Sequence, residues 1–166
     1  KSIPAQLSQE NKKFVFGHIK EGARARDYRS AITWVTQAGI AQCVKRVGNP
    51  EIPLAAYVDE SAFKLFFSDV GLFCAMLGID ERSVIEGNKI FAQHKGALTE
   101  QYVCQQLVSD CGLDPYYWTA KNSTGEIDFV LQVEGKVYPV EVKAEQHTRA
   151  RSLNSFCKRY EYAVAR

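Results

Sequence analysis

Two β-compatible runs in the C-terminal half of this sequence are separated by only two residues. The segment from Gly125 to Glu145 reads GEIDFVLQVEGKVYPVEVKAE, with Glu134-Gly135 at its centre. A two-residue loop that ends in glycine is a typical turn of a β-hairpin. The sequence therefore predicts a hairpin over residues 126–143.

The turn also predicts the register of the two strands. If Val133 pairs with Lys136, every later pair follows by stepping outwards one residue on both strands. Asp128 is then expected to lie directly opposite Glu141. The further predicted pairs are Glu126 with Lys143 on that polar face, and Ile127 with Val142, Phe129 with Val140 and Leu131 with Tyr138 on an apolar face.

Two carboxylates that face one another need a compensating charge. Opposed residues have Cβ atoms about 4.5–5.5 Å apart, where like charges are destabilising, so we expect a cation between Asp128 and Glu141. Hard oxygen ligands suit Mg²⁺ or Mn²⁺, and zinc is disfavoured because the sequence has no His/Cys cluster. Lys143, on the same face, is expected to orient or deprotonate a water, or to stabilise charge on a phosphate. These three residues predict the catalytic centre of a metal-dependent phosphodiesterase.

Glu100 is the third carboxylate expected at this site. On a helical projection of residues 96–111, Val103, Cys104, Leu107 and Cys111 lie on the same side as Glu100. A carboxylate on an apolar helix face is costly unless it is paired or bound to a metal. We therefore expect Glu100 to reach the metal that Asp128 and Glu141 bind.

Simpler interpretations remain open for these residues. Glu126 and Lys143 have the pattern of an ordinary cross-strand ion pair on a solvated face, which stabilises little. Asp128 and Glu141 have the pattern of a solvated strand edge, where the two side chains bend away from each other. The three histidines are widely spaced in the sequence, which predicts that they lie at the surface or have hydrogen-bond partners within the protein.

Basic residues in two regions are candidates for contacts with nucleic-acid phosphates. The net charge of +2 does not by itself indicate nucleic-acid binding. Arg149 and Arg151 follow the Glu-Val-Lys run, where a solvated helix start is the competing interpretation. The candidates in the N-terminal half are Lys12, Lys13, Arg24, Arg26 and Arg29.

The remaining patterns predict an α/β (α+β) chain in two parts. Residues 27–37, 40–47 and 63–67 indicate helix, strand and strand, which favours a small winged-helix-like unit over residues 1–85. Residues 86–166 predict the order α-β-β-β-α-β, with helices at 96–111 and 148–160 and a strand at 116–119. Residues 162–165 suggest a strand just beginning, so we expect the C-terminus to be truncated.

The composition favours a folded cytoplasmic protein. Hydrophobic residues make up 46% and charged residues 24% of the sequence, as in ordinary globular domains. The five cysteines form no Cys-x-x-Cys pair and predict reduced thiols. No apolar run approaches the roughly 18 residues that cross a membrane, so no membrane partner is expected.

Glu100, the GEIDF segment and Glu141-Val142-Lys143 together resemble the PD-(D/E)XK, or restriction-endonuclease-like, fold. Glu126-Ile127-Asp128 stands where that family has a proline-aspartate motif. The wider chain resembles the C-terminal domain of unknown function of prokaryotic AAA-type ATPases. That resemblance is carried by SIPAQLSQENKKF, YRSAITWVTQAGI, LAAYVDESAFKLFFSDVGL, GALTEQYV and YYW.

The resemblance implies an ATPase module N-terminal to a winged-helix-like segment and a nuclease-like domain. This chain has no G-x-x-x-x-G-K-[ST] loop, so no ATP site is expected within it. The leading hypothesis is a Mg²⁺-dependent nuclease, with DNA favoured over RNA. The alternatives are a non-cleaving DNA-binding module or a protein-interaction and assembly module of the ATPase. The sequence does not determine the oligomeric state.

Overall fold

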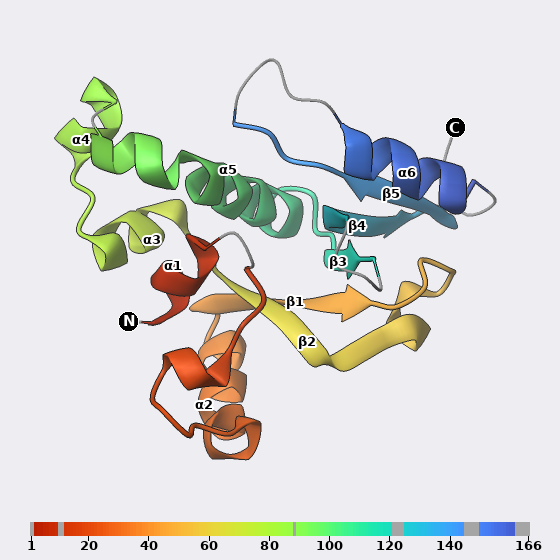
Figure 1. Cartoon of the computed structure of the whole chain (residues 1–166), viewed down its shortest axis with the longest axis horizontal. Coiled ribbons are helices and arrows are strands. Elements are labelled where there is room, and N and C mark those ends of the chain that lie inside the picture. Colours follow the sequence, from red (N-terminus) through yellow and green to blue (C-terminus); the bar gives the residue numbers. More distant parts are fainter. Residues whose placement is uncertain (1, 10–11, 88, 121–124, 145–149, 162–166) are drawn as a thin grey trace. The chain divides into compact units, whose positions relative to one another are not determined.

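The computed structural model describes residues 2–9, 12–87, 89–120, 125–144 and 150–161 (Figure 1). The chain forms two compact units, each made of two stretches of sequence. Unit 1 comprises residues 1–43 and 63–105, and unit 2 comprises residues 44–62 and 106–166. The helical elements are α1 Ser2–Leu7, η1 Phe16–His18, α2 Ala25–Gln37, η2 Leu54–Tyr57, α3 Val70–Leu77, α4 Glu81–Glu86, α5 Lys89–Ser109 and α6 Arg151–Arg159.

A mixed five-stranded sheet runs in the order β2-β1-β3-β4-β5 (Figure 1). Its strands are β1 Ala41–Val47, β2 Val58–Phe67, β3 Tyr116–Thr119, β4 Glu126–Val133 and β5 Lys136–Val140. β1 is parallel to β3, whereas β3, β4 and β5 follow one another antiparallel. The fold is therefore α/β, as the sequence predicted. The parallel pairing of β1 with β3 has no local sequence signal and was not predicted.

Most predicted elements occur close to their expected places. Helix α2 and strand β1 match the predicted helix and strand within two residues, and β3 has the predicted bounds. Helix α5 begins seven residues before the predicted start at Gly96. The start of the last predicted helix, at Thr148, and the predicted strand over residues 162–165 fall outside the described residues.

Aromatic side chains hold α6 against the sheet of unit 2. The ring centroid of Trp118 lies 5.1 Å from that of Phe156 and 5.8 Å from that of Tyr160, both edge-to-face. Figure 1 shows α6 lying along β4 and β5. The buried members of this core are Val47, Leu54, Trp118, Ile127, Val130, Val137, Phe156 and Tyr160. Burial of these apolar side chains fixes the position of α6 beside the hairpin.

The predicted hairpin register is confirmed over the paired part of the two strands. Val133 pairs with Lys136, and the turn between them has φ angles of 48° at Glu134 and 73° at Gly135. The other pairs confirmed are Leu131 with Tyr138 and Phe129 with Val140. β5 ends at Val140, so the strand pairs predicted beyond that point do not form. These are Ile127 with Val142, Asp128 with Glu141 and Glu126 with Lys143.

A bulge in β4 explains part of this difference. Tyr116 pairs with Val130 and Trp118 with Ile127, so β4 has two residues, Asp128 and Phe129, where β3 has one. The extra residue shifts the alternation, which places Ile127 on the face of Val130 and not on that of Phe129. The prediction of one continuous apolar face through Ile127 and Phe129 was therefore wrong.

The edge of the sheet in unit 1 is closed by a side chain. β2 is an edge strand, and such strands expose unpaired backbone groups. The carboxamide of Gln101 on α5 accepts the Phe67 amide at 2.8 Å and donates to the Phe67 carbonyl at 2.6 Å. One turn later, Gln105 accepts the Val70 amide at 2.8 Å. These two glutamines join α5 to the end of β2 and the start of α3.

Replacement of Gln101 by alanine is expected to lower the free energy of unfolding by about 2 to 4 kcal/mol. The substitution leaves both the amide and the carbonyl of Phe67 buried without their present partner. Denaturant unfolding of Gln101→Ala measures this. Gln105→Ala is the matched control, for which a loss of about 1 kcal/mol is expected. Equal losses in the two variants would contradict the assigned role of Gln101.

Candidate functional site

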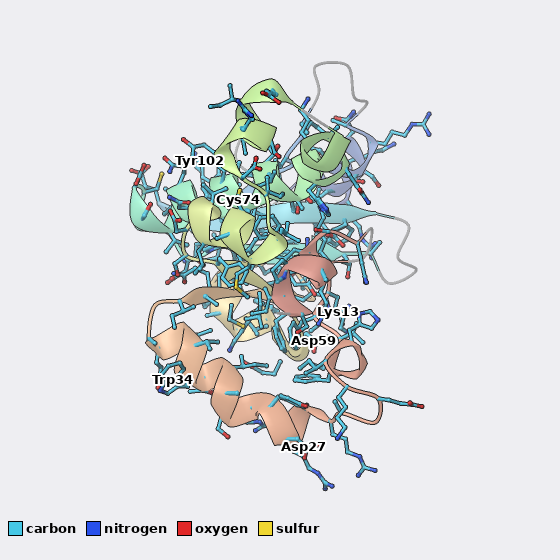
Figure 2. All side chains as sticks on the ribbon, turned by 90° about the vertical axis from the view of Figure 1, so that its left-hand side faces the viewer. Lys13, Asp27, Trp34, Asp59, Cys74 and Tyr102 are labelled. Atoms are coloured by element: carbon cyan, nitrogen blue, oxygen red, sulfur yellow. The ribbon has the colours of Figure 1, made fainter. Side chains whose placement is uncertain are left out.

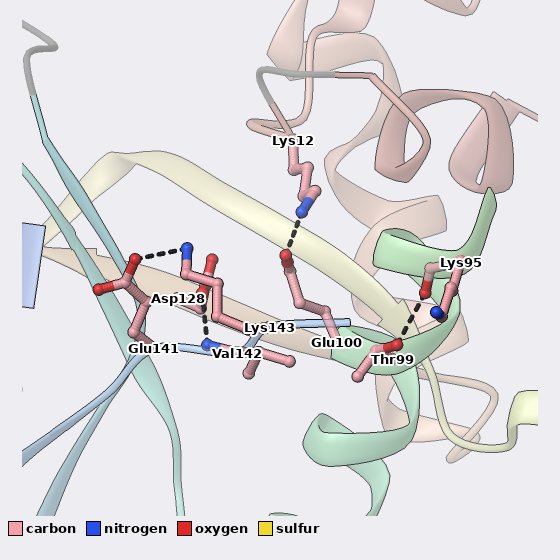
Figure 3. A network of polar contacts seen from close by, with 8 residues as sticks. All are labelled: Lys12, Lys95, Thr99, Glu100, Asp128, Glu141, Val142 and Lys143. Atoms are coloured by element: carbon pink, nitrogen blue, oxygen red, sulfur yellow. Dashed lines mark hydrogen bonds and ion pairs between the residues drawn. The ribbon is translucent and has the colours of Figure 1, made fainter. Parts of the chain in front are cut away.

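Asp128 contacts the segment that carries the other two candidate residues of unit 2. Its Oδ2 accepts the backbone amide of Val142 at 2.8 Å (Figure 3). Asp128 is half-buried and belongs to the bulge of β4. Within the described part of the chain, no residue donates to its Oδ1. One oxygen of this carboxylate therefore holds the backbone, and the other is available to a ligand.

Glu141 lies between a helix end and an ammonium group. Its Oε2 accepts the amide of Leu153 at 3.1 Å, and its Oε1 lies 2.5 Å from Nζ of Lys143. Leu153 is the third residue of α6, and Ala150 at the N-cap has no side chain to accept that amide. Glu141 therefore supplies the cap that the local sequence lacks, and the positive end of the helix dipole favours its negative charge.

Lys143 is the exposed member of this group. Its side chain is 40% exposed, whereas that of Glu141 is 7% exposed. The ammonium thus reaches solvent while it remains paired with the buried carboxylate (Figure 3). An anionic substrate that approaches from solvent would meet Lys143 before Glu141.

Glu100 belongs to unit 1 and has a protein cation beside it. It is 5% exposed and forms an ion pair with Lys12 (Figure 3). Lys12 thus provides the compensating charge that the sequence led us to expect from a metal, and its own side chain is only 17% exposed. The predicted approach of Glu100 to Asp128 and Glu141 would join the two units and stays a prediction.

The surroundings of Glu100 are strongly desolvated. Burial raises the pKa of the Cys104 thiol to about 12, with opposing effects from the nearby charges of Lys64 and Glu100. Lys64 on β2 is fully buried, and the sequence analysis missed it. A lysine within the apolar run from Ala62 to Phe67 was the signal that could have found it. Cys111, predicted on the same helix face, is exposed and follows the end of α5.

The residues of unit 2 fit the oxygen chemistry of a Mg²⁺ or Mn²⁺ site. Counting only donors among the described residues, one oxygen of Asp128 has none, and each oxygen of Glu141 accepts one donor and keeps a further lone pair. Mg²⁺ is usually bound by one or two carboxylates plus several waters. Among the residues that the structure describes, no group of three or more His, Cys, Asp or Glu side chains is arranged to hold a metal.

The predicted phosphate-binding arginines are exposed where the structure describes them. Arg24, Arg26 and Arg29 are all exposed, and helix α2 buries none of its residues. Figure 2 shows Asp27 and Trp34 on this helix; Asp27 pairs with Arg26 at 3.5 Å. The final two candidates are Arg151, exposed at the start of α6, and Arg149, which lies outside the described residues.

The chain is a mixed α/β protein that has Asp128 on β4 and Glu141 and Lys143 just beyond β5. Residues 1–83, half of the chain, match the family described as a domain of unknown function (DUF8612), and the chain belongs to that family. Residues 95–166 match a second domain of unknown function (DUF4143). The domain boundary predicted between residues 85 and 86 falls between the two matches and itself stays a prediction.

Two curated relatives share part of this sequence. They are uncharacterized proteins of Mycobacterium tuberculosis and Mycobacterium bovis, each 31% identical to the chain over 80 residues. The match covers 48% of this chain, which spans only 17% of the length of either relative. No solved structure matches the chain. Across the described residues, no helix is long and apolar enough to cross a membrane.

Replacement of Glu141 by alanine is expected to destabilise the protein by about 1 to 2 kcal/mol, because α6 loses its capping acceptor. Glu141→Gln keeps an amide oxygen for the Leu153 amide and is expected to lose less than half as much. Thermal or denaturant unfolding compares them. Glu60→Ala, which removes an exposed carboxylate from the same unit, is the control. A loss no larger than that of the control would contradict the capping role.

Proposed function

We propose that unit 2 binds a divalent metal ion and hydrolyses phosphodiester bonds in nucleic acid, with DNA as the favoured substrate. The observation that supports this most directly is the hydrogen bond between Asp128 and the Val142 amide. It joins the Asp128 carboxylate to the residue between Glu141 and Lys143. Two carboxylates and a lysine, one carboxylate on β4 and the other two groups just beyond β5, are the groups that metal-assisted phosphodiester hydrolysis needs.

Asp128 and Glu141 would hold the metal, either Mg²⁺ or Mn²⁺. A metal bound there lowers the pKa of a water and neutralises charge on the phosphate. Lys143, exposed and adjacent, donates to a phosphate oxygen or orients the attacking water. Hydrolysis joins the water oxygen to phosphorus, breaks the bond to the leaving sugar oxygen, and transfers a proton to that oxygen. Glu100 is proposed as a supporting carboxylate.

The wider context of this proposal comes from sequence resemblance. We propose a restriction-endonuclease-like fold for the nuclease-like domain and a winged-helix-like fold for the preceding segment. The partner implied is the ATPase module of a longer cytoplasmic protein, in which this chain would be the C-terminal portion. The antiparallel arrangement of β3, β4 and β5 with α6 against them is compatible with such a core.

The metal and the lysine can be tested separately. Calorimetric titration with Mn²⁺ is expected to show binding by the wild type and a loss of more than about 100-fold in affinity for Asp128→Asn. Cleavage of plasmid and single-stranded DNA is expected to fall about 100- to 1000-fold in Lys143→Gln, with Mn²⁺ binding retained. Lys136→Gln, an exposed lysine of the same hairpin, is the control and should match the wild type.

The hydrolytic function would be wrong if the wild type and Asp128→Asn were equally inert on both forms of DNA. Circular dichroism should accompany both assays, because Asp128 also holds the Val142 amide. A folded Asp128→Asn variant with unchanged Mn²⁺ affinity would rule out the proposed metal ligand.

A second candidate function is DNA binding without cleavage, through α2 of unit 1. The observation that favours it is the wide exposed face of this helix: no residue between Ala25 and Gln37 is buried, and only Tyr28, Ile32, Val35 and Thr36 are half-buried. Arg26 and Arg29 are three positions apart and therefore share one helix face. Ser30, Thr33 and Gln37 lie on the same face and add hydrogen-bonding groups for phosphates.

The double substitution Arg26→Gln with Arg29→Gln is expected to weaken binding of a short DNA duplex in EDTA. The slope of log affinity against log salt should become shallower by about 2, because about one counterion is released for each phosphate contact. Fluorescence anisotropy at several salt concentrations measures the slope. Arg82→Gln with Lys136→Gln removes the same charge from other exposed positions and should not change it. Equal slopes in the two double variants would exclude α2.

A further inference from the structure

The outer face of α6 carries positive charge without a carboxylate. Its inner side is fixed by Phe156, Leu153 and Tyr160, which pack in the core of unit 2. The residues left exposed on the helix are Arg151, Asn154, Ser155, Lys158 and Arg159. All of them are cations or uncharged hydrogen-bonding residues, so this face is complementary to an anion.

The spacing of these residues suits a polymer with repeated negative charges. Arg151 and Lys158 are seven residues apart, which is about 10 Å along a helix axis. One strand of duplex DNA advances about 3.4 Å per phosphate, so this interval spans about three phosphate steps. Asn154 and Ser155 lie between the two cations on the same side of the helix and offer donors for the intervening phosphates.

The cations on this face remain available to a ligand. Neither Arg151 nor Lys158 forms an ion pair with another residue in the parts of the chain that the structure describes. The guanidinium carbon of Arg159 lies 5.4 Å from the ring centroid of Tyr160, a cation–π contact. The carboxylate of Glu141 at the N-terminal end is engaged by Lys143 and the Leu153 amide.

An anionic membrane surface fits this helix less well than a nucleic acid does. Helices that lie on membranes insert an apolar face between lipids. The apolar side of α6 is already buried in the protein core, and none of the exposed large apolar side chains belongs to this helix. The exposed side has only polar contacts to offer, as phosphate-binding surfaces do.

We infer that the outer face of α6 binds the sugar-phosphate backbone of duplex DNA and leads the strand towards the hairpin site. The hydrogen bond from the Leu153 amide to Glu141 ties the first turn of α6 to that site. This inference rests on the proposed function for its substrate class. It concerns binding alone, however, and needs neither the metal nor hydrolysis.

The test measures binding of a short DNA duplex of mixed sequence by fluorescence anisotropy, in EDTA and at several salt concentrations. Arg151→Gln with Lys158→Gln is expected to lower the affinity about tenfold or more near 0.1 M salt. The slope of log affinity against log salt should become shallower by about 2. Arg151→Lys with Lys158→Arg keeps both charges and should retain the wild-type slope. The charge-matched control is again Arg82→Gln with Lys136→Gln, which should bind as the wild type does.

Three results would overturn the inference. The first is that the Arg151→Gln, Lys158→Gln variant binds the duplex with the affinity and salt slope of the wild type. The second is that the charge-matched control loses as much affinity as this variant does. The third is wild-type protein that binds phosphatidylserine vesicles but no DNA. The Mn²⁺ titration and cleavage assays test the hydrolytic function separately. If the protein bound DNA through α6 but did not cleave it, the inference about α6 would stand and the hydrolytic function would be wrong.

Discussion

The hydrogen bond between the Asp128 carboxylate and the Val142 amide is the contact on which the candidate site depends. A longer β5 would have offered that amide to a backbone carbonyl of β4. The side chain takes it instead, just beyond the point where β5 ends at Val140. The bulge at Asp128 and Phe129 makes this exchange possible, because bulges commonly redirect a side chain at the end of a paired region. The Asp128 carboxylate that is proposed to bind metal therefore also holds the local backbone in place.

Glu141, like Asp128, has a structural role as well as a proposed function, and its structural role is at α6. It caps a helix whose own N-cap residue is alanine, and it pairs with Lys143 through its other oxygen. The buried aromatic contacts of Trp118, Phe156 and Tyr160 then fix the rest of the helix on the sheet. Glu141, which is proposed to bind metal, therefore also positions the helix that is proposed to bind DNA. The exposed residues of α6 neither cap the helix nor pack it on the sheet.

Two buried polar side chains of unit 1 have partners within the protein. The carboxamide of Gln101 pairs with the buried amide and carbonyl of Phe67, and Lys12 balances the charge of Glu100. Both arrangements follow from the high cost of burying an unpaired polar or charged group. A buried carboxylate is therefore weak evidence for a metal by itself. The Glu141 segment makes the stronger case, because an exposed lysine and a second carboxylate lie beside it.

Local sequence patterns were enough to predict many of the helices and strands, the α/β class and the register of the hairpin as far as Val140. Turn residues and the spacing of apolar residues concern positions that are close together in the sequence, so they can be recognised without knowing which distant residues pack against them. Three features became known only from the three-dimensional structure: the parallel pairing of β1 with β3, the bulge at Asp128 and the pairing of Lys12 with Glu100. These depend on residues far apart in the chain. The partners of the candidate side chains could therefore not be predicted from the sequence, and the functional role of these residues stays a prediction.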